Sequence, residues 1–130
     1  FVGCQYTNSS GQTVQAQYYP GTGVTNAIAY VVDDPVAVFK VAVTDAGGAI
    51  ATVTQAAVGT NVTALVNTPS ANTGDAATSI LSTSPAVTAT FPFRIIDVVK
   101  DTAVTATTFC EVIVKINLHQ YNTALGNAVA

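Results

Sequence analysis

The sequence predicts an all-β fold, a sandwich or barrel of about seven to nine short, mainly antiparallel strands with at most one short helix. Two observations carry this prediction. Residues with β-branched side chains, which favour extended backbone, number 47 (20 Val, 20 Thr and 7 Ile), against 4 Leu, 3 Lys and 1 Glu. Turn-forming residues also interrupt the apolar runs at short intervals. Because 130 residues suffice for one sizeable core, we expect a single β domain over residues 1–130.

The N-terminal part of the chain is expected to form a hairpin. Residues 1–6 (FVGCQY) predict a first strand, and residues 7–11 (TNSSG) predict a loop that ends in glycine. Residues 12–19 then return as a second strand with alternating polarity. Its apolar face holds Val14, Ala16 and Tyr18, so the strand should be half-exposed.

Residues 27–44 (AIAYVVDDPVAVFKVAVT) form the most apolar stretch and hold two Val-rich runs. Asp33, Asp34 and Pro35 separate the runs as a turn would, because proline fixes φ and aspartate bonds its own backbone. The second run, residues 36–43, is apolar on nearly both faces. We therefore expect it in the middle of a sheet covered on both faces, or at a subunit contact.

The middle of the chain predicts short elements. One short helix is possible within residues 49–58, near residues 52–57, where apolar residues fit a 3.6-residue period. The other expected elements, in order, are a strand at 62–66, an exposed polar loop at 67–77 and a short strand at 78–84.

The C-terminal part predicts two further strands joined by a polar connection at residues 100–107. Within the apolar region 87–99, Pro92 cannot donate to a ladder, which predicts a sheet edge or a bulge at that point. In the last strand, residues 109–118, one face is a continuous core; it holds Cys110, Val112, Val114, Ile116 and Leu118.

Charged residues make up only 8% of the chain, and the formal net charge is −3. Such a surface suits a protein that packs against copies of itself or a larger partner; a secreted, Thr-rich surface kept soluble by hydroxyls is the alternative. The four basic residues are separated in the sequence, which predicts no direct nucleic-acid binding. No run of 18 apolar residues and no signal peptide occur, so we expect no membrane partner. The chain begins at Phe1 and contains no Met, so we expect either a processed product or a chain whose N-terminal segment is missing.

Cys4 and Cys110 are the two cysteines. A disulfide between them would close a loop of roughly 100 residues, worth about 4–5 kcal/mol in the chain-entropy model. Two isolated thiols buried as small apolar groups are the alternative that we favour, although the strands that hold them could be neighbours in one sheet. Neither cysteine lies in a C-x-x-C pair, so neither redox nor zinc chemistry is indicated.

The remaining chemical candidates are weak. His119 is the one possible general base, but no nucleophile motif accompanies it, and we expect it to cap the last strand. Asp33 and Asp34 could bind Ca²⁺, yet adjacent carboxylates on an extended chain point apart, which favours the turn. The triplets that begin at Asn8 and Asn61 fit the glycosylation pattern, as chance matches would in a Thr-rich chain. We therefore expect a protein that is no enzyme, with no catalytic, cofactor-binding or metal site.

Three stretches taken together resemble a known family. They are FVGCQY with QYYPG, AYVVDDPVAVF, and FRIIDVV with EVIVKINLHQYN. They are similar to small virion structural proteins of tailed bacteriophages, especially marine ones, over residues 1–39 and 91–122. The resemblance implies a capsid decoration or cement protein on the virion surface, present as a homo-oligomer or in many copies, with the major capsid protein as its partner. A secreted adhesin or fimbrial-type sandwich that binds a glycan or receptor is the alternative.

Overall fold

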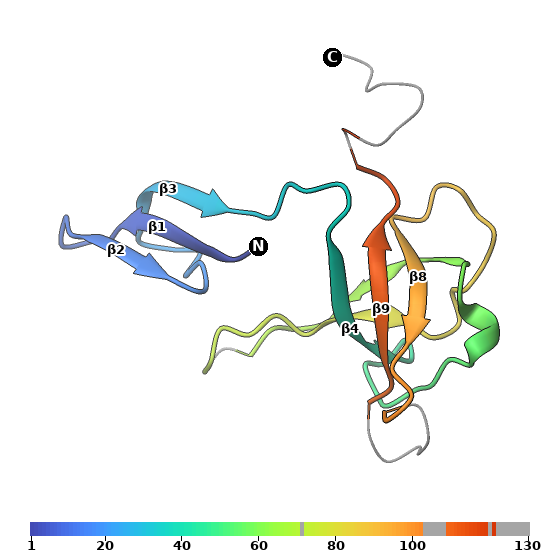
Figure 1. Cartoon of the computed structure of the whole chain (residues 1–130). Helices are drawn as coiled ribbons and strands as arrows, with labels where there is room; N and C mark the ends of the chain where they lie inside the picture. The colour runs from blue at the N-terminus through green and yellow to red at the C-terminus, as the bar shows by residue number, and fades with distance from the viewer. Residues whose placement is uncertain (71, 103–108, 120, 122–130) are drawn as a thin grey trace. The chain divides into compact units, whose positions relative to one another are not determined.

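The structure is a computed structural model of the chain that describes residues 1–70, 72–102, 109–119 and 121. The described residues form nine strands in two sheets and one short 3-10 turn, which confirms the predicted all-β fold (Figure 1). They divide into two compact units. Unit 1 holds Phe1–Asp34 and Thr68–Ala77, and unit 2 holds Pro35–Asn67 and the described residues from Thr78 onwards. Cooperative folding of both as one domain stays a prediction.

Unit 1 contains a three-stranded antiparallel sheet with the order β2-β1-β3. Its strands are β1 (Gly3–Thr7), β2 (Thr13–Ala16) and β3 (Thr25–Tyr30). The predicted hairpin between β1 and β2 is present, because Asn8 Oδ1 accepts hydrogen bonds from the N–H groups of Ser10 (3.0 Å) and Gln12 (2.9 Å). Bonds of this kind fold an asparagine back on its own backbone and fix the turn.

Unit 2 contains a six-stranded sheet with the order β5-β8-β9-β4-β7-β6. Its strands are β4 (Val38–Thr44), β5 (Asn61–Val62), β6 (Ala64–Val66), β7 (Thr78–Leu81), β8 (Phe93–Val98) and β9 (Glu111–Ile116). The β4–β7 pair is parallel and the other pairs are antiparallel. The two outer strands, β5 and β6, are separated in the chain only by Thr63, so the sheet curls until its edges meet and is nearly barrel-shaped (Figure 1).

The core of unit 2 lies inside this curled sheet. The face of β9 predicted as core is buried, since Cys110, Val112 and Val114 are all 0% exposed. Val43, Val62, Ile80 and Ile95 complete the centre, and Phe39 and Val41 pack against it from β4. Leu118, at the far end of the predicted core face, is 49% exposed, because β9 ends at Ile116 and the chain leaves the sheet there.

β4 lies between β9 and β7, so the prediction that the run 36–43 lies in the middle of a sheet is confirmed. Cover on both of its faces is not found among the described residues. Phe39, Val41 and Val43 face the core, whereas Val36 and Val38 are 69% and 57% exposed. The subunit contact that the sequence offered as an alternative stays a prediction.

Several predicted boundaries move in the structure. The helical option shrinks to the 3-10 turn Gln55–Ala57. The strand predicted at 62–66 is two strands, β5 and β6, which pair with different partners. The prediction for Pro92 is wrong, because β8 begins after it, and the register shift within β8 lies between Ile95 and Asp97.

Residues 45–48 form a tight turn between β4 and the segment that follows it, closed by a hydrogen bond from the Gly48 N–H to the Asp45 carbonyl at 3.1 Å. Asp45 Oδ1 accepts from the N–H groups of Gly47 (2.8 Å) and Ala49 (2.9 Å). Gly48 has φ +81°, a value that a residue with a side chain adopts only with strain. Local side-chain bonds therefore contribute to this turn, and the side chain of Asn67 lies close against Gly48.

Candidate interaction surfaces

The sheet of unit 1 has one small apolar face. Cys4 lies opposite Ala16 on β2 and Ala29 on β3, and Val14 lies opposite Tyr6, so these side chains share one side of the sheet. Gln5 lies opposite Gln15 and Ile28 on the other side, where Tyr30 Oη donates to Gln5 Oε1 (3.4 Å). The apolar face consists mostly of alanine, valine and cysteine, so it can bury little surface of its own.

Tyr18 and the segment Thr68–Ala77 anchor the rest of unit 1. The thiol of Cys4 donates to the carbonyl oxygen of Tyr18 at 3.3 Å. A Cβ atom built on Gly74 would overlap the ring and Cβ of Tyr18, and Gly74 also has φ +72°. The backbone at position 74 therefore lies directly against Tyr18, and only glycine fits there. The sequence predicted this segment as a loop but gave no sign that it belongs with the first strands.

Unit 1 has almost no buried core. Among its described residues only Cys4, at 3% exposure, is buried. All six residues of β3 are exposed. Eight large apolar side chains of unit 1 are exposed by 42% or more; they are Phe1, Val2, Tyr18, Tyr19, Ile28, Tyr30, Val31 and Val32. Apolar exposure at this density is typical of a surface that another molecule covers.

The charges of the two units differ. Unit 1 carries three carboxylates (Asp33, Asp34 and Asp75) and no basic side chain, whereas all four basic residues belong to unit 2. Asp33 and Asp34 lie in the link that follows β3, outside any strand, and each has an interaction partner. The net negative charge therefore lies in the smaller unit, where exposed large apolar side chains are denser along the chain.

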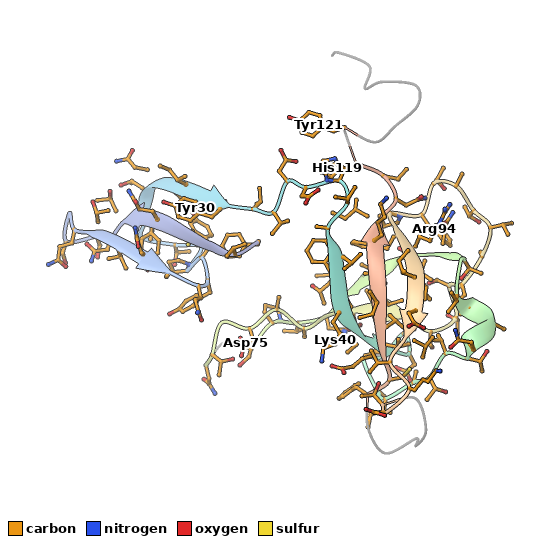
Figure 2. All side chains as sticks on the ribbon, viewed as in Figure 1. Tyr30, Lys40, Asp75, Arg94, His119 and Tyr121 are labelled. Atoms are coloured by element: carbon orange, nitrogen blue, oxygen red, sulfur yellow. The ribbon has the colours of Figure 1, made fainter. Side chains whose placement is uncertain are left out.

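The outer face of β4, β9 and β8 combines apolar and charged side chains. Val38 lies opposite Lys115, and Lys40 Nζ forms an ion pair with Glu111 Oε1 at 3.0 Å (Figure 2). Ile96 is 43% exposed on the neighbouring strand β8. This mixture resembles the apolar patch with a polar rim that protein contacts use.

Arg94 has a structural partner. It lies opposite Asn61, and its Nε donates to Asn61 Oδ1 at 3.1 Å, while Asn61 Nδ2 donates to the carbonyl of Thr88 at 3.0 Å.

The two glycosylation triplets differ in accessibility. Asn61 is 5% exposed, so a glycan could not be attached to it without opening the fold. Asn8, the other candidate, is only partly buried and lies in the β1–β2 turn. Of the two glycosylation triplets, the fold leaves only the first accessible.

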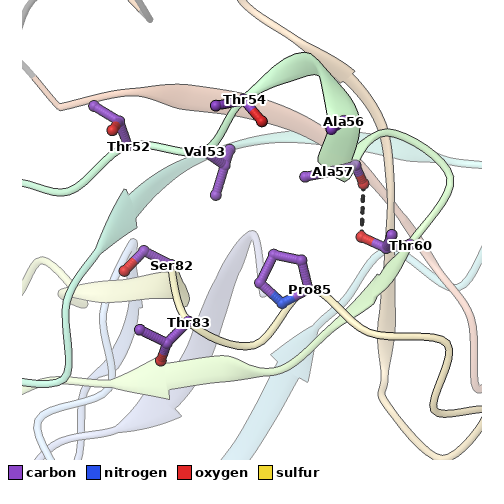
Figure 3. Close-up of a pocket in the computed structure, with 9 residues that line it drawn as sticks. All are labelled: Thr52, Val53, Thr54, Ala56, Ala57, Thr60, Ser82, Thr83 and Pro85. Carbon is purple, nitrogen blue, oxygen red and sulfur yellow. Dashed lines mark hydrogen bonds between the residues drawn. The ribbon is translucent and has the colours of Figure 1, made fainter.

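An open hollow of about 480 Å³ lies beside the 3-10 turn in unit 2 (Figure 3). Its lining holds five hydroxyl side chains, those of Thr52, Thr54, Thr60, Ser82 and Thr83, beside apolar Val53, Ala57 and Pro85. Thr60 Oγ1 donates to the Ala57 carbonyl at 2.6 Å, so that hydroxyl is already engaged. None of the lining residues is ionisable, so the hollow offers no acid, base or nucleophile pair of the kind catalysis needs.

His119, the one candidate general base, follows β9 and is 9% exposed. Its Nδ1 accepts from the N–H of Tyr121 at 3.2 Å, and the two rings lie 5.5 Å apart at 45° (Figure 2). Both contacts are with Tyr121, beyond the end of β9 at Ile116, so the capping of the last strand by His119 stays a prediction. The described residues contain no group of three or more His, Cys, Asp or Glu that could hold a metal ion.

Both thiols are free and buried, so the prediction of two isolated cysteines is confirmed. The idea that they could be neighbours in one sheet is wrong, because Cys4 is in β1 of unit 1 and Cys110 directly precedes β9 of unit 2.

In the described part of the chain, no helix has the length and apolar character needed to cross a membrane. No protein family, no curated protein and no solved structure matches the chain.

Proposed function

We propose that this chain is a non-enzymatic virion structural protein, a decoration or cement protein on the head of a tailed bacteriophage. In this role many copies bind the major capsid protein at the capsid surface and reinforce the contacts between its subunits. The observation that carries the proposal is the exposed apolar surface of unit 1, where Cys4 is the one buried residue among those described. The resemblance of three stretches to phage virion proteins supports the major capsid protein as the partner that covers this surface.

Physical reasoning supports such a role. Three strands with little apolar cover are marginally stable in water, so unit 1 would gain stability by laying its surface on a partner. The outer face around Val38 offers a second contact of the same kind. A cement protein does not need a tight single contact, because many modest contacts on one shell give a large combined affinity.

The test is binding to heads. Purified full-length chain would be mixed with heads of the phage that encodes it, and sedimented through a cushion. We expect saturable binding with a fixed number of copies per head, and raised resistance of the heads to heating. Heads of an unrelated tailed phage serve as the control and should bind none. A chain that sediments as a monodisperse monomer and leaves its own heads unbound would overturn the proposal.

The second candidate is a secreted adhesin, and one observation favours it. A hollow of about 290 Å³ in unit 1 has Gln15, Gln17 and Tyr30 among its lining residues. Amides both donate and accept, and an aromatic ring offers an apolar face, which together suit a neutral sugar. Binding of the chain to glycans or host cells, with no binding to heads, would support this candidate over the first.

A further inference from the structure

We infer that β3 is a pairing edge, and that its partner is β3 of a second copy of this chain, related by a two-fold axis at Ala29. β3 is the last strand of the order β2-β1-β3, and its six residues are exposed. Its only paired strand in the described chain is β1. An edge strand of this kind presents a row of backbone donors and acceptors, which another extended strand complements. The inference rests on the proposed function, which brings many copies together.

The devices that usually protect an edge are missing from most of β3. The sequence TNAIAY contains no charge and no proline. A register shift opposite Gln5 and Thr7, with Asn26 at φ +52°, disturbs only the beginning of the strand. From Ile28 to Tyr30 the pairing with β1 is regular, one residue against one. This half of the strand is therefore straight enough to accept a neighbour.

A second copy fits better than a charged partner. None of the three strands of unit 1 contains a charged residue, so two copies can lie edge to edge with no like charges directly opposite each other along the paired strands. A strand carrying acids or bases would find no counter-charge along β3. An antiparallel two-fold contact is also self-complementary, so that one strand serves both copies.

Backbone direction fixes the register. The carbonyl of Tyr30 points to the β1 side, where it accepts from the Val2 N–H at 2.8 Å. Backbone groups alternate along a strand, so those of Ala29 point to the free edge. A two-fold axis at Ala29 lets the two Ala29 residues exchange both hydrogen bonds. Ile28 then lies opposite Tyr30 of the second copy on each side, an aromatic and β-branched pair of the kind that stabilises sheets.

Cysteine pairs test this register. Chains with Ile28→Cys and Tyr30→Cys, mixed in equal amounts under mild oxidation, should form the mixed covalent dimer at least about ten times faster than either forms its own dimer, because only the mixed pair lies directly opposite. Both variants keep Cys4, and the new thiols lie on the other side of the sheet from it.

A second measurement uses the axis itself. In chains with Cys4→Ala, we expect Ala29→Cys to form a covalent dimer rapidly, because directly opposite residues of this type are about 5.5 Å apart at Cα, within disulfide reach. Ala27→Cys is the matched control. In this register the two copies of residue 27 are offset by four residues, roughly 13 Å, which is beyond that reach.

The outcomes separate the pairing from the proposed function. Equal rates for the mixed and single cysteine variants, or no covalent dimer even on saturated heads, would overturn the pairing. If the wild type still binds heads in that case, the proposed function stands without it. Rapid mixed dimers from a chain that binds no heads would support the pairing and overturn the decoration role.

Discussion

The two units of this chain have similar compositions, but only unit 2 forms a packed core. Both are poor in charge and rich in valine and threonine. Unit 2 curls a six-stranded sheet around Val43, Ile95, Val112 and Val114, each 0% exposed. Unit 1 has three strands and buries Cys4 alone among its described residues. The difference teaches that strand-forming composition does not make a core; a sheet must close on itself or find another surface.

The largest expected effect comes from comparing a core-facing with an outward-facing substitution on β4 of unit 2. Phe39→Asp places a charge against the core and should destabilise unit 2 by more than about 4 kcal/mol, so that the chain fails to fold. Val38→Asp changes a neighbour that is 57% exposed, and should leave the circular dichroism spectrum unchanged while weakening head binding. Unfolding of both variants would show that the outer face of β4 is not a free surface.

The next effect compares one substitution in both units. Ile95→Ala removes a side chain that is 0% exposed and should cost about 2–5 kcal/mol in the free energy of unfolding. Ile28→Ala removes one that is 54% exposed and, at dilutions where the chain is monomeric, should change it by less than about 0.5 kcal/mol. Urea titration of the full chain measures both. Similar losses at the two positions would contradict the contrast between a packed and an unpacked unit.

The smallest effect is a difference in the alkylation rates of the two cysteine thiols, since each unit contains one cysteine. Under native conditions Cys4 should react with an alkylating reagent on the order of 100-fold faster than Cys110, because a unit with little buried surface opens at a lower free energy. Mass spectrometry of the time course assigns each site. Equal rates would mean that unit 1 opens only when unit 2 does.

Two glycine variants test whether the contact between Gly74 and Tyr18 limits the alkylation rate of Cys4. Gly74→Ala should increase the Cys4 rate further, because its Cβ overlaps Tyr18. Gly11→Ala is the matched control. Gly11 also has a positive φ, +79°, but nothing lies within 4 Å of its Cβ position, so backbone strain alone is measured. If both variants increase the rate equally, the contact between Gly74 and Tyr18 does not hold unit 1 together.

The sequence by itself determined the features that depend on near neighbours. Alternation with a period of two identified the core face of the last strand at Cys110, Val112 and Val114. Side-chain bonds to nearby backbone set the turns at Asn8 and Asp45, and β-branched residues made the fold all-β. Each of these follows from residues within a few positions of one another, so a linear pattern suffices.

Only the tertiary structure decided which strands far apart in the sequence are partners. The two apolar runs on either side of Asp33, Asp34 and Pro35 look alike, yet β3 lies in a small exposed sheet and β4 in the middle of a nearly closed one. The parallel pairing of β4 with β7 and the place of Thr68–Ala77 in unit 1 also join residues far apart in sequence. A period of two shows which side chains share a face but not what covers that face, because cover depends on long-range packing.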